Sequence, residues 1–534
     1  MSRLASVANM MEKYSDWLNP ILVKENRQSL KSRQFVVTFM LLLLVSWIIT
    51  VSVTAYNYNS MEYGRVGPMF VTAYYWVLGV AVFIVVPYGA YRSLMSERDE
   101  NTSELLMITT LSPSRIVWGK LFSALLQLFI YYSAISPFIA FTSLLEGFEQ
   151  FPVMFTLVWS MVLSLLLSTF MMMLSLNSRQ RHWQALSTLF AFGLLLFAFF
   201  SITGMFTGII NSAIPFDTFE FWMWNVFLLI GCLSYAVLFQ QITAAQLTHE
   251  SGNRSTKIRF VASMQFLLIW VTIAAIVAFT PSGAGGAELF VTLFMVLFVH
   301  WGVVTLFVCT EHDYLSRRIR RDLPRRRLWR TLMIPFLPGG AFGLLYSAIH
   351  VTALLALVMF AAANYSYGSV IRVNPEAFVG LACYFVIFAS VGTFLIRTGH
   401  SLSGEFRPAH ARIITVLFVL FCIIAPLIPR VFSQYTRYSQ YEVYDIINPV
   451  FTVNYLAGIG YYNAAIDRDT ALFVLVAAAV LGVLCNLPAF RRATKIVFHA
   501  EETLPEFLDP NNVFEMADDE PETSAPLNPS PQQI

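Results

Sequence analysis

Charged side chains are scarce in this chain of 534 residues and make up only 12% of it. A soluble domain carries about 25%, so there are too few ionic groups here to solvate the surface of a globule of this size. Hydrophobic residues reach 57% and include 47 phenylalanines. Lipid can solvate such a surface and water cannot. The composition therefore excludes an ordinary soluble protein and predicts an integral membrane protein.

Cysteine is also rare. Each of the five cysteines lies inside an apolar run, and no two of them have the spacing of metal ligands or lie in loops where a disulfide framework is expected. This distribution argues against a disulfide-stabilised scaffold and against a cysteine metal site. All five are predicted to be small buried hydrophobic side chains, namely Cys232, Cys309, Cys383, Cys422 and Cys485.

Motifs of catalysis and nucleotide binding are missing. The sequence has no G-x-x-x-x-G-K-[ST] phosphate loop, no G-x-G-x-x-G, and no H-E-x-x-H, C-x-x-C or G-x-S-x-G motif. We therefore expect that the chain is not an enzyme, that it cannot hydrolyse ATP alone, and that it holds no cofactor or metal.

The apolar runs contain almost no Asp, Glu, Lys or Arg; their main ionisable residues are His300 and His350. Proton- and sodium-driven carriers normally need carboxylates inside the membrane, so this absence disfavours them. A lone membrane histidine more often forms hydrogen bonds between helices. The energy for any transport is therefore expected to come from outside this chain.

Long apolar runs dominate what is present. A spanning helix needs roughly 20 mostly apolar residues, and 29 of the 34 Lys and Arg residues lie in segments that would be cytoplasmic if the N-terminus is cytoplasmic. This bias predicts an even number of spans with both termini in the cytoplasm. The fold class expected is an all-α, polytopic membrane helical bundle of about twelve transmembrane helices. The predicted spans are 35–56, 68–91, 121–145, 152–177, 185–210, 220–244, 260–281, 289–309, 341–363, 377–396, 413–429 and 470–489.

Four parts follow along the chain. Residues 1–34 form a cytoplasmic N-terminus with an amphipathic interfacial helix, 35–245 a first six-helix membrane half, and 246–489 a second half of about six helices. Residues 490–534 form a cytoplasmic tail, whose last 34 residues hold nine acidic residues, six prolines and no Lys or Arg. Such a composition is typical of disorder.

An arginine-rich connector, residues 310–334, contains the run RRIRRDLPRRRLWR. It is predicted to be cytoplasmic, to fix the topology and to meet anionic lipid headgroups. A docking surface for a partner is the alternative.

The segment 431–469 is predicted to be the longest external segment. Its many tyrosines are typical of an interfacial belt, and NPVFTVNYLAG within it predicts a short interfacial or re-entrant helix.

The loop after the second span, from Ser96 to Lys120, is the most informative segment. Asn101 followed three residues later by Glu104 resembles a capping box, and it is followed by an apolar patch that includes Leu105 and Leu106. Ser112 before a proline predicts a second helix start that continues into the third span. We therefore expect two short helices here rather than an irregular connector.

Upstream, residues 19–35 place Ile21, Leu22 and Leu30 among Lys24, Arg27, Lys31 and Arg33, which predicts an amphipathic helix on the inner membrane surface.

These two segments resemble the membrane subunits of ABC-2 type ABC transporters, the mostly bacterial exporter permeases. In that family an interfacial helix often begins Asn-Pro and carries Lys-Glu or Arg-Glu, and here the matching residues are Asn19, Pro20, Lys24 and Glu25. The loop after the second span typically reads E-R-x-x-x-T-x-E-L-L, then a Leu-Ser turn, then a stretch ending Gly-Lys. The matching residues in this chain are Glu97, Arg98, Thr102, Glu104, Leu105, Leu106, Leu111, Ser112, Gly119 and Lys120. The end of the fourth span is also similar, through Ser175, Leu176, Arg179, Arg181 and Ala185.

The resemblance covers residues 19–245. It implies a permease subunit, an exporter, in the bacterial inner (cytoplasmic) membrane, in contact with membrane lipids and driven by a separate cytoplasmic ABC ATPase subunit that uses ATP. The loop residues just given, together with Asn101, would form the ATPase-coupling site. The chain departs from the family in length, because a common subunit has about six spans and residues 246–489 carry no second copy of the loop motif. Either a homodimer of this chain or one chain with two ATPases fits; no nucleic acid partner is expected.

Two other functions stay open. A membrane-embedded enzyme acting on lipid-linked glycans would use the external segment, with Arg430, Arg437, Asp445 and Asp467 as its residues. A non-transporting membrane scaffold or sensor is the other. A permease should copurify with an ATPase, and a scaffold need not.

Overall fold

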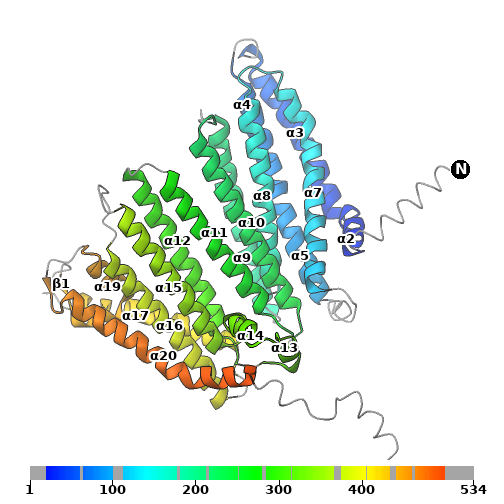
Figure 1. Cartoon of the computed structure of the whole chain (residues 1–534). Coiled ribbons are helices and arrows are strands. Elements are labelled where there is room, and N and C mark those ends of the chain that lie inside the picture. The colour runs from blue at the N-terminus through cyan, green and yellow to red at the C-terminus, as the bar shows by residue number, and fades with distance from the viewer. Residues whose placement is uncertain are drawn as a thin grey trace, which may run out of the picture. The chain divides into compact units, whose positions relative to one another are not determined.

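The computed structural model describes residues 20–60, 64–99, 112–176, 181–211, 216–249, 252–279, 284–313, 315–365, 374–403, 406–432, 440–459 and 463–498. These residues are mostly helical, and the contacts of the chain divide it into two compact units, Met1–Thr280 and Pro281–Ile534 (Figure 1). The predicted boundary between the halves lies at residue 245, whereas the helix that follows it packs on the preceding helix and belongs to the first unit.

The first unit is a bundle of long helices. Its helices are α2 (Pro20–Leu30), α3 (Arg33–Tyr56), α4 (Gly67–Gly79), the π-helix η2 (Val80–Val85), α5 (Val86–Asp99), α7 (Pro113–Thr142), α8 (Gln150–Ser175), α9 (Arg181–Asn211), α10 (Phe219–Leu247) and α11 (Thr256–Phe279), with a short 3-10 turn η1 (Tyr58–Ser60). The main core cluster is formed by α4, η2, α5, α7 and α8, around Phe70, Tyr74 and Phe83.

The second unit combines long helices with short elements at their ends. The helices are α12 (Ala284–Cys309), α13 (Arg317–Arg321), α14 (Arg327–Met333), α15 (Gly340–Tyr365), α16 (Pro375–Leu402), α17 (Pro408–Ile424), α18 (Leu427–Phe432), α19 (Pro449–Leu456) and α20 (Arg468–Phe498), with 3-10 turns η3 (Ile334–Phe336) and η4 (Val443–Ile447). Two short strands, β1 (Gln440–Tyr441) and β2 (Asn463–Ala464), pair in parallel, with Gln440 opposite Asn463.

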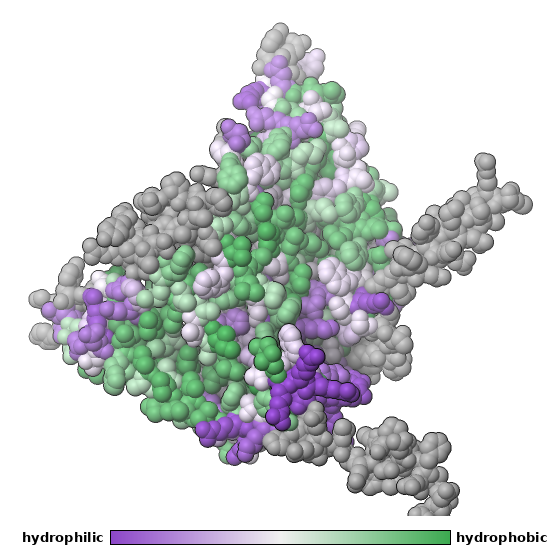
Figure 2. All heavy atoms as spheres, in the orientation of Figure 1, coloured by the Kyte–Doolittle hydropathy of each residue, from purple (hydrophilic) through white to green (hydrophobic). Residues whose placement is uncertain are grey.

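Ten helices within the described residues are long and apolar enough to cross a membrane. The two remaining predicted spans coincide with α11 and α12, in which many side chains lie outside the described residues. Large apolar side chains are exposed along the helices, such as Val37 at 56% and Trp47 at 61% on α3, and apolar residues cover much of the surface in Figure 2. Water does not favour apolar patches of this extent. The protein is therefore all-α, with the architecture of a multi-pass membrane protein.

The second span changes its helical form midway. Pro87 has no N–H to offer the preceding turn, and the six residues before Val86 adopt the wider π-helix η2. The hydroxyl of Ser164 on α8 donates a hydrogen bond to the carbonyl oxygen of Val82, 2.7 Å away. A neighbouring helix thus satisfies a carbonyl inside the bilayer region, as the tolerance of proline in membrane helices requires.

The predicted burial of the cysteines is confirmed for four of them. Cys232, Cys309, Cys383 and Cys422 are buried free thiols, but the prediction is wrong for Cys485, which is exposed on α20. The neighbouring Leu481 and Leu484 are also exposed on this helix. An apolar residue in a spanning helix can face lipid as well as the core, and hydropathy does not distinguish the two.

The histidines at 300 and 350 lie beside Trp301. His350 donates from Nδ1 to the carbonyl oxygen of Tyr346 one turn earlier on α15, 2.8 Å away, so this hydrogen bond stays within one helix. Its contact with α12 is a stacked ring pair with Trp301, with ring centroids 4.5 Å apart. This ring contact links α12 and α15 at His350.

A glycine sets the spacing of α12 and α15. A Cβ at Gly343 would overlap the carbonyl group of Val308, which belongs to the backbone of α12 and cannot rotate away. We expect Gly343→Ala to destabilise the second unit by about 1–3 kcal/mol through overpacking, measured by equilibrium unfolding in mixed micelles. Gly302→Ala is the control, because its Cβ would lie 3.8 Å from the ring of Phe385. Equal stability of both variants would contradict the close helix contact.

Candidate functional site

The loop that carries the predicted coupling motif is described only at its two arms. Residues 100–111 lie outside the described residues, and with them Asn101, Thr102, Glu104, Leu105, Leu106 and Leu111. Glu97 and Arg98 lie at the end of α5 on one arm. Ser112, Gly119 and Lys120 lie at the start of α7 on the other.

The second arm begins as predicted. Ser112 is the N-cap of α7, and its hydroxyl accepts a hydrogen bond from the N–H of Arg115, 3.4 Å away, while Pro113 fills the first helical position. The helix then runs without a break to Thr142. The prediction that a helix starts at Ser112 and continues into the third span is therefore confirmed.

Lys120 is the centre of a buried ionic cluster. Its side chain is 1% exposed, and Nζ lies 2.7 Å from Oε1 of Glu25 and 2.9 Å from Oε1 of Glu97. Nζ also donates to Oγ of Ser93, 2.6 Å away. The Ser93 hydroxyl in turn donates to Oε2 of Glu25 over 3.1 Å. The carbonyl oxygen of Ser93 is a more distant acceptor, 3.4 Å from Nζ. An ammonium group has three N–H donors, and the three nearest oxygens match them.

The cluster joins three helices that are far apart in the sequence. Glu25 lies on α2, Ser93 and Glu97 on α5, and Lys120 on α7. Ser93 and Glu97 are four residues apart, so they share one face of α5. Helix α2 packs on α7, and Ile21 is buried one turn before Glu25. The amphipathic helix predicted for this segment is confirmed as a helix, and it is held to the bundle by both apolar packing and charge.

The stability of each charged side chain in this cluster depends on the opposite charge beside it. The two carboxylates are 13% and 14% exposed, and one cation lies between them. Removing one member of a buried ion pair typically costs about 3–5 kcal/mol because the remaining charge is left without compensation. The ends of α2, α5 and α7 that carry these residues should therefore move as one unit.

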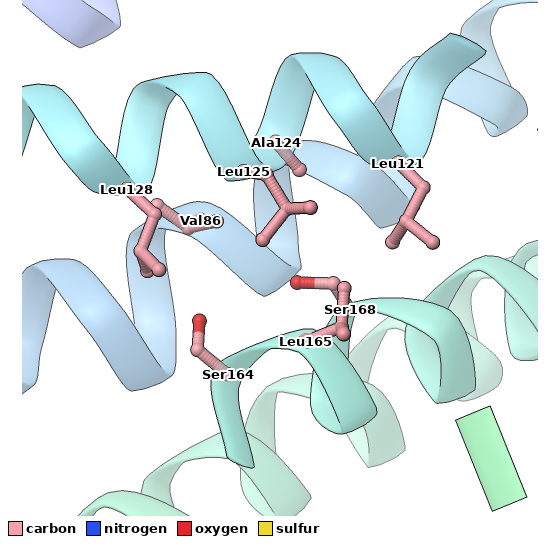
Figure 3. A pocket seen from close by; sticks show the side chains of 8 residues that line it. All are labelled: Val86, Leu121, Ala124, Leu125, Leu128, Ser164, Leu165 and Ser168. Atoms are coloured by element: carbon pink, nitrogen blue, oxygen red, sulfur yellow. The ribbon is translucent and has the colours of Figure 1, made fainter. Parts of the chain in front are cut away.

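Next to the cluster, helices α5, α7 and α8 pack closely along a contact that we call the seam. Ser164 and Ser168 of α8 face Val86 of α5 and the row Leu121, Ala124, Leu125 and Leu128 of α7 (Figure 3). Small side chains allow membrane helices to approach closely. A displacement of the start of α7 would thus reach α5 and α8 through direct contacts.

The sequence did not predict that these residues contact one another. Ser93 was missed altogether, and Glu25, Glu97 and Lys120 were noted only as separate motif positions. Two signals point to the cluster in retrospect. Lys120 is a single cation at the start of a long apolar run, and Ser93 and Glu97 have the spacing of one helix face.

The external segment uses its charged residues differently. The buried carboxylate of Asp445 accepts from Nη2 and Nε of Arg430, at 2.5 and 3.1 Å, and also from the N–H of Glu442. Asp467 lies elsewhere, before α20, where hydrogen bonds from Thr470 lower the pKa of its exposed carboxyl group. Arg437 lies outside the described residues. The short helix predicted from NPVFTVNYLAG is confirmed as α19, with Asn448 as its N-cap.

These contacts hold the segment together rather than form an open site. Both oxygens of Asp445 are engaged, and the Arg430 guanidinium also lies over the ring of Phe451, 4.3 Å from its centroid. Within the described ranges, no group of three or more His, Cys, Asp or Glu residues could hold a metal ion.

The Lys120 cluster is thus the candidate site that the geometry defines best. No protein-family model matches this chain, and no curated protein or solved structure matches it either.

Proposed function

We propose that this chain is the membrane-spanning permease subunit of an ABC-2 type transporter and is driven by a separate cytoplasmic ATPase. The single observation that carries the proposal is the buried contact of Lys120 with Glu25 and Glu97. All three residues are positions at which the sequence resembles that family. In the proposed arrangement both termini are cytoplasmic, about twelve helices span the membrane, and substrate moves outward.

The cluster suits the transmission of a force. Glu97 precedes the loop and Lys120 follows it, so their ion pair closes the loop at its base. A push on residues 100–111 therefore cannot be absorbed by separation of the two arms without breaking a buried ion pair. It acts on the second span, the third span and α2 as one body.

The ATPase supplies the free energy by contacting the loop differently in its ATP-bound and ATP-free states. A conformational change needs such a difference in contact free energy, and tight binding alone does not produce it. In the proposed site Asn101 and Glu104 cap the coupling helix, Leu105 and Leu106 fill a cleft on the ATPase, and Arg98 orients the loop. The re-packing then passes along the seam of α5, α7 and α8.

Affinity purification in mild detergent, with mass spectrometry of bound proteins, tests the partner. We expect a Walker-motif ATPase with the unaltered chain and its loss with Leu105→Asp plus Leu106→Asp, because two buried carboxylates would face an apolar cleft. Leu144→Asp is the matched control, since Leu144 is 81% exposed in the α7–α8 connection. Its variant should retain the ATPase.

Two outcomes would change the proposal. If the double variant retains the ATPase, the docking surface lies elsewhere on the chain. If no ATPase is recovered with any form, the permease function is contradicted.

A further inference from the structure

The arginine-rich connector folds into a defined surface. Helices α13 and α14, together with the short segment between them, carry six exposed arginines and, beside them, the exposed apolar side chains of Leu328 (70%), Trp329 (55%) and Leu332 (57%). We call these nine residues the arginine surface; its cations are Arg317, Arg318, Arg321, Arg325, Arg326 and Arg327. A hydrophilic patch lies over α13 and α14 in Figure 2. Residues 310–334 hold eight arginines against three acidic residues, so the surface has a clear excess of positive charge.

The underside of this surface is fixed to the end of α20. Leu315, Ile319 and Leu323 pack in one apolar cluster with Ala493 and Val497 of α20. In Figure 1 the red end of α20 lies beside α13 and α14.

The buried Arg330 completes this attachment. It donates from Nε to the carbonyl oxygen of Pro324, 3.0 Å away, and from Nη1 to that of Val497, 3.5 Å away. A cation at the last carbonyls of a helix compensates groups that have no partner within the helix. The chain beyond Phe498 therefore starts at the arginine surface.

The composition of that continuing chain complements the surface. Residues 501–522 contain nine acidic residues and no Lys or Arg, interleaved with apolar residues such as Phe507, Leu508 and Phe514. The first two acids, Glu501 and Glu502, follow Val497 by four and five residues. At about 3.5 Å per residue they can reach no further than roughly 18 Å from it. An acidic and apolar segment is thus tethered beside a basic and apolar surface.

We propose that residues 501–522 bind the arginine surface of α13 and α14 as an internal ligand. The tether gives the segment an effective concentration of the order of millimolar at this surface. The attachment at Val497 keeps the segment and the surface on the same side of the membrane whichever side that is. Bound in this way, the segment would cover arginines that could otherwise meet anionic lipid headgroups. This inference does not depend on the proposed transport function.

A peptide-binding experiment tests it on the full chain. The probe is a fluorescent peptide of residues 501–522, and the receptor is the full chain in neutral detergent with all nine tail acids replaced by Gln or Asn. We expect this tail-neutral chain to bind the peptide. The unaltered chain should bind it at least roughly tenfold more weakly, because its own segment occupies the surface. Binding should weaken as salt is raised.

A charge-matched pair of variants locates the site. In the tail-neutral chain, Arg325→Gln, Arg326→Gln and Arg327→Gln together should weaken peptide binding roughly tenfold. Lys24→Gln, Arg27→Gln and Arg92→Gln remove the same charge from exposed positions of the first unit and should leave it unchanged. Both variants must elute as single species of the size of the unaltered chain.

Any of four results would overturn the proposal. The peptide could fail to bind the tail-neutral chain, or both triple variants could weaken binding equally, which would indicate only a general charge effect. In the third result, the tail-neutral chain binds micelles doped with anionic phospholipid through these arginines but does not bind the peptide. That result would assign the surface to lipid. If the arginine variant does not fold, equal peptide affinity of the unaltered and tail-neutral chains contradicts occupancy by the segment.

Discussion

Lys120→Met is expected to lower the free energy of unfolding of the first unit by about 3–5 kcal/mol. The substitution keeps a long apolar stem but leaves two mostly buried carboxylates, Glu25 and Glu97, without their shared cation. Equilibrium unfolding in mixed micelles, followed by tryptophan fluorescence, measures the loss. A loss below about 1 kcal/mol would be the behaviour of an exposed pair and would contradict the buried cluster.

Two further variants separate charge from packing. Lys24→Met removes an exposed lysine from the same helix as Glu25 and should change stability by no more than about 0.5 kcal/mol. The triple variant Glu25→Gln, Glu97→Gln and Lys120→Met removes all three charges and should regain most of the lost stability, since neutral groups of similar size can replace a buried ion pair at little cost. It therefore supplies a folded chain without the ionic link.

Arg430→Met should have an effect of similar size, about 3–5 kcal/mol, on the second unit. The carboxylate of Asp445 is fully buried, and Arg430 supplies two of its hydrogen bonds. Pairing the change with Asp445→Asn should restore part of the loss, because an amide carries no charge to compensate.

Arg468→Met is the matched control in the same segment. Its guanidinium lies 5.7 Å from the ring centroid of Tyr455, but the residue is exposed, so the cost should stay below about 1 kcal/mol. The same unfolding assay compares the two. Similar losses for both arginines would show that Arg430 acts only through its aromatic contact and would contradict a structural ion pair at Asp445.

Local patterns made much of the fold predictable. Apolar runs near 20 residues gave a helix at each expected span, because the bilayer fixes the length of a spanning helix. The N-cap of α7 at Ser112 and that of α19 at Asn448 were also predictable, since a cap depends on the residues immediately beside it. Such features require no knowledge of the distant chain.

Long-range contacts were not predictable in the same way. Glu25 and Lys120 are 95 residues apart, and Arg330 and Val497 are 167 apart. Hydropathy shows which segments are helical but not which faces meet, so it also failed at Cys485, an apolar position that is exposed rather than buried. The charged residues that hold each unit together are visible only after the helices have been packed.

The claim that the cluster transmits the motion of the ATPase is tested most directly by hydrogen exchange of the copurified complex with and without ATP. The unaltered chain should show an ATP-dependent change in amide protection in α2 and at the start of α7. The triple neutral variant should retain the ATPase and near-native stability but lose that change, because α2, α5 and α7 are no longer joined by charge. An identical ATP response in the triple variant would show that the Lys120 cluster stabilises the fold without coupling it to a partner.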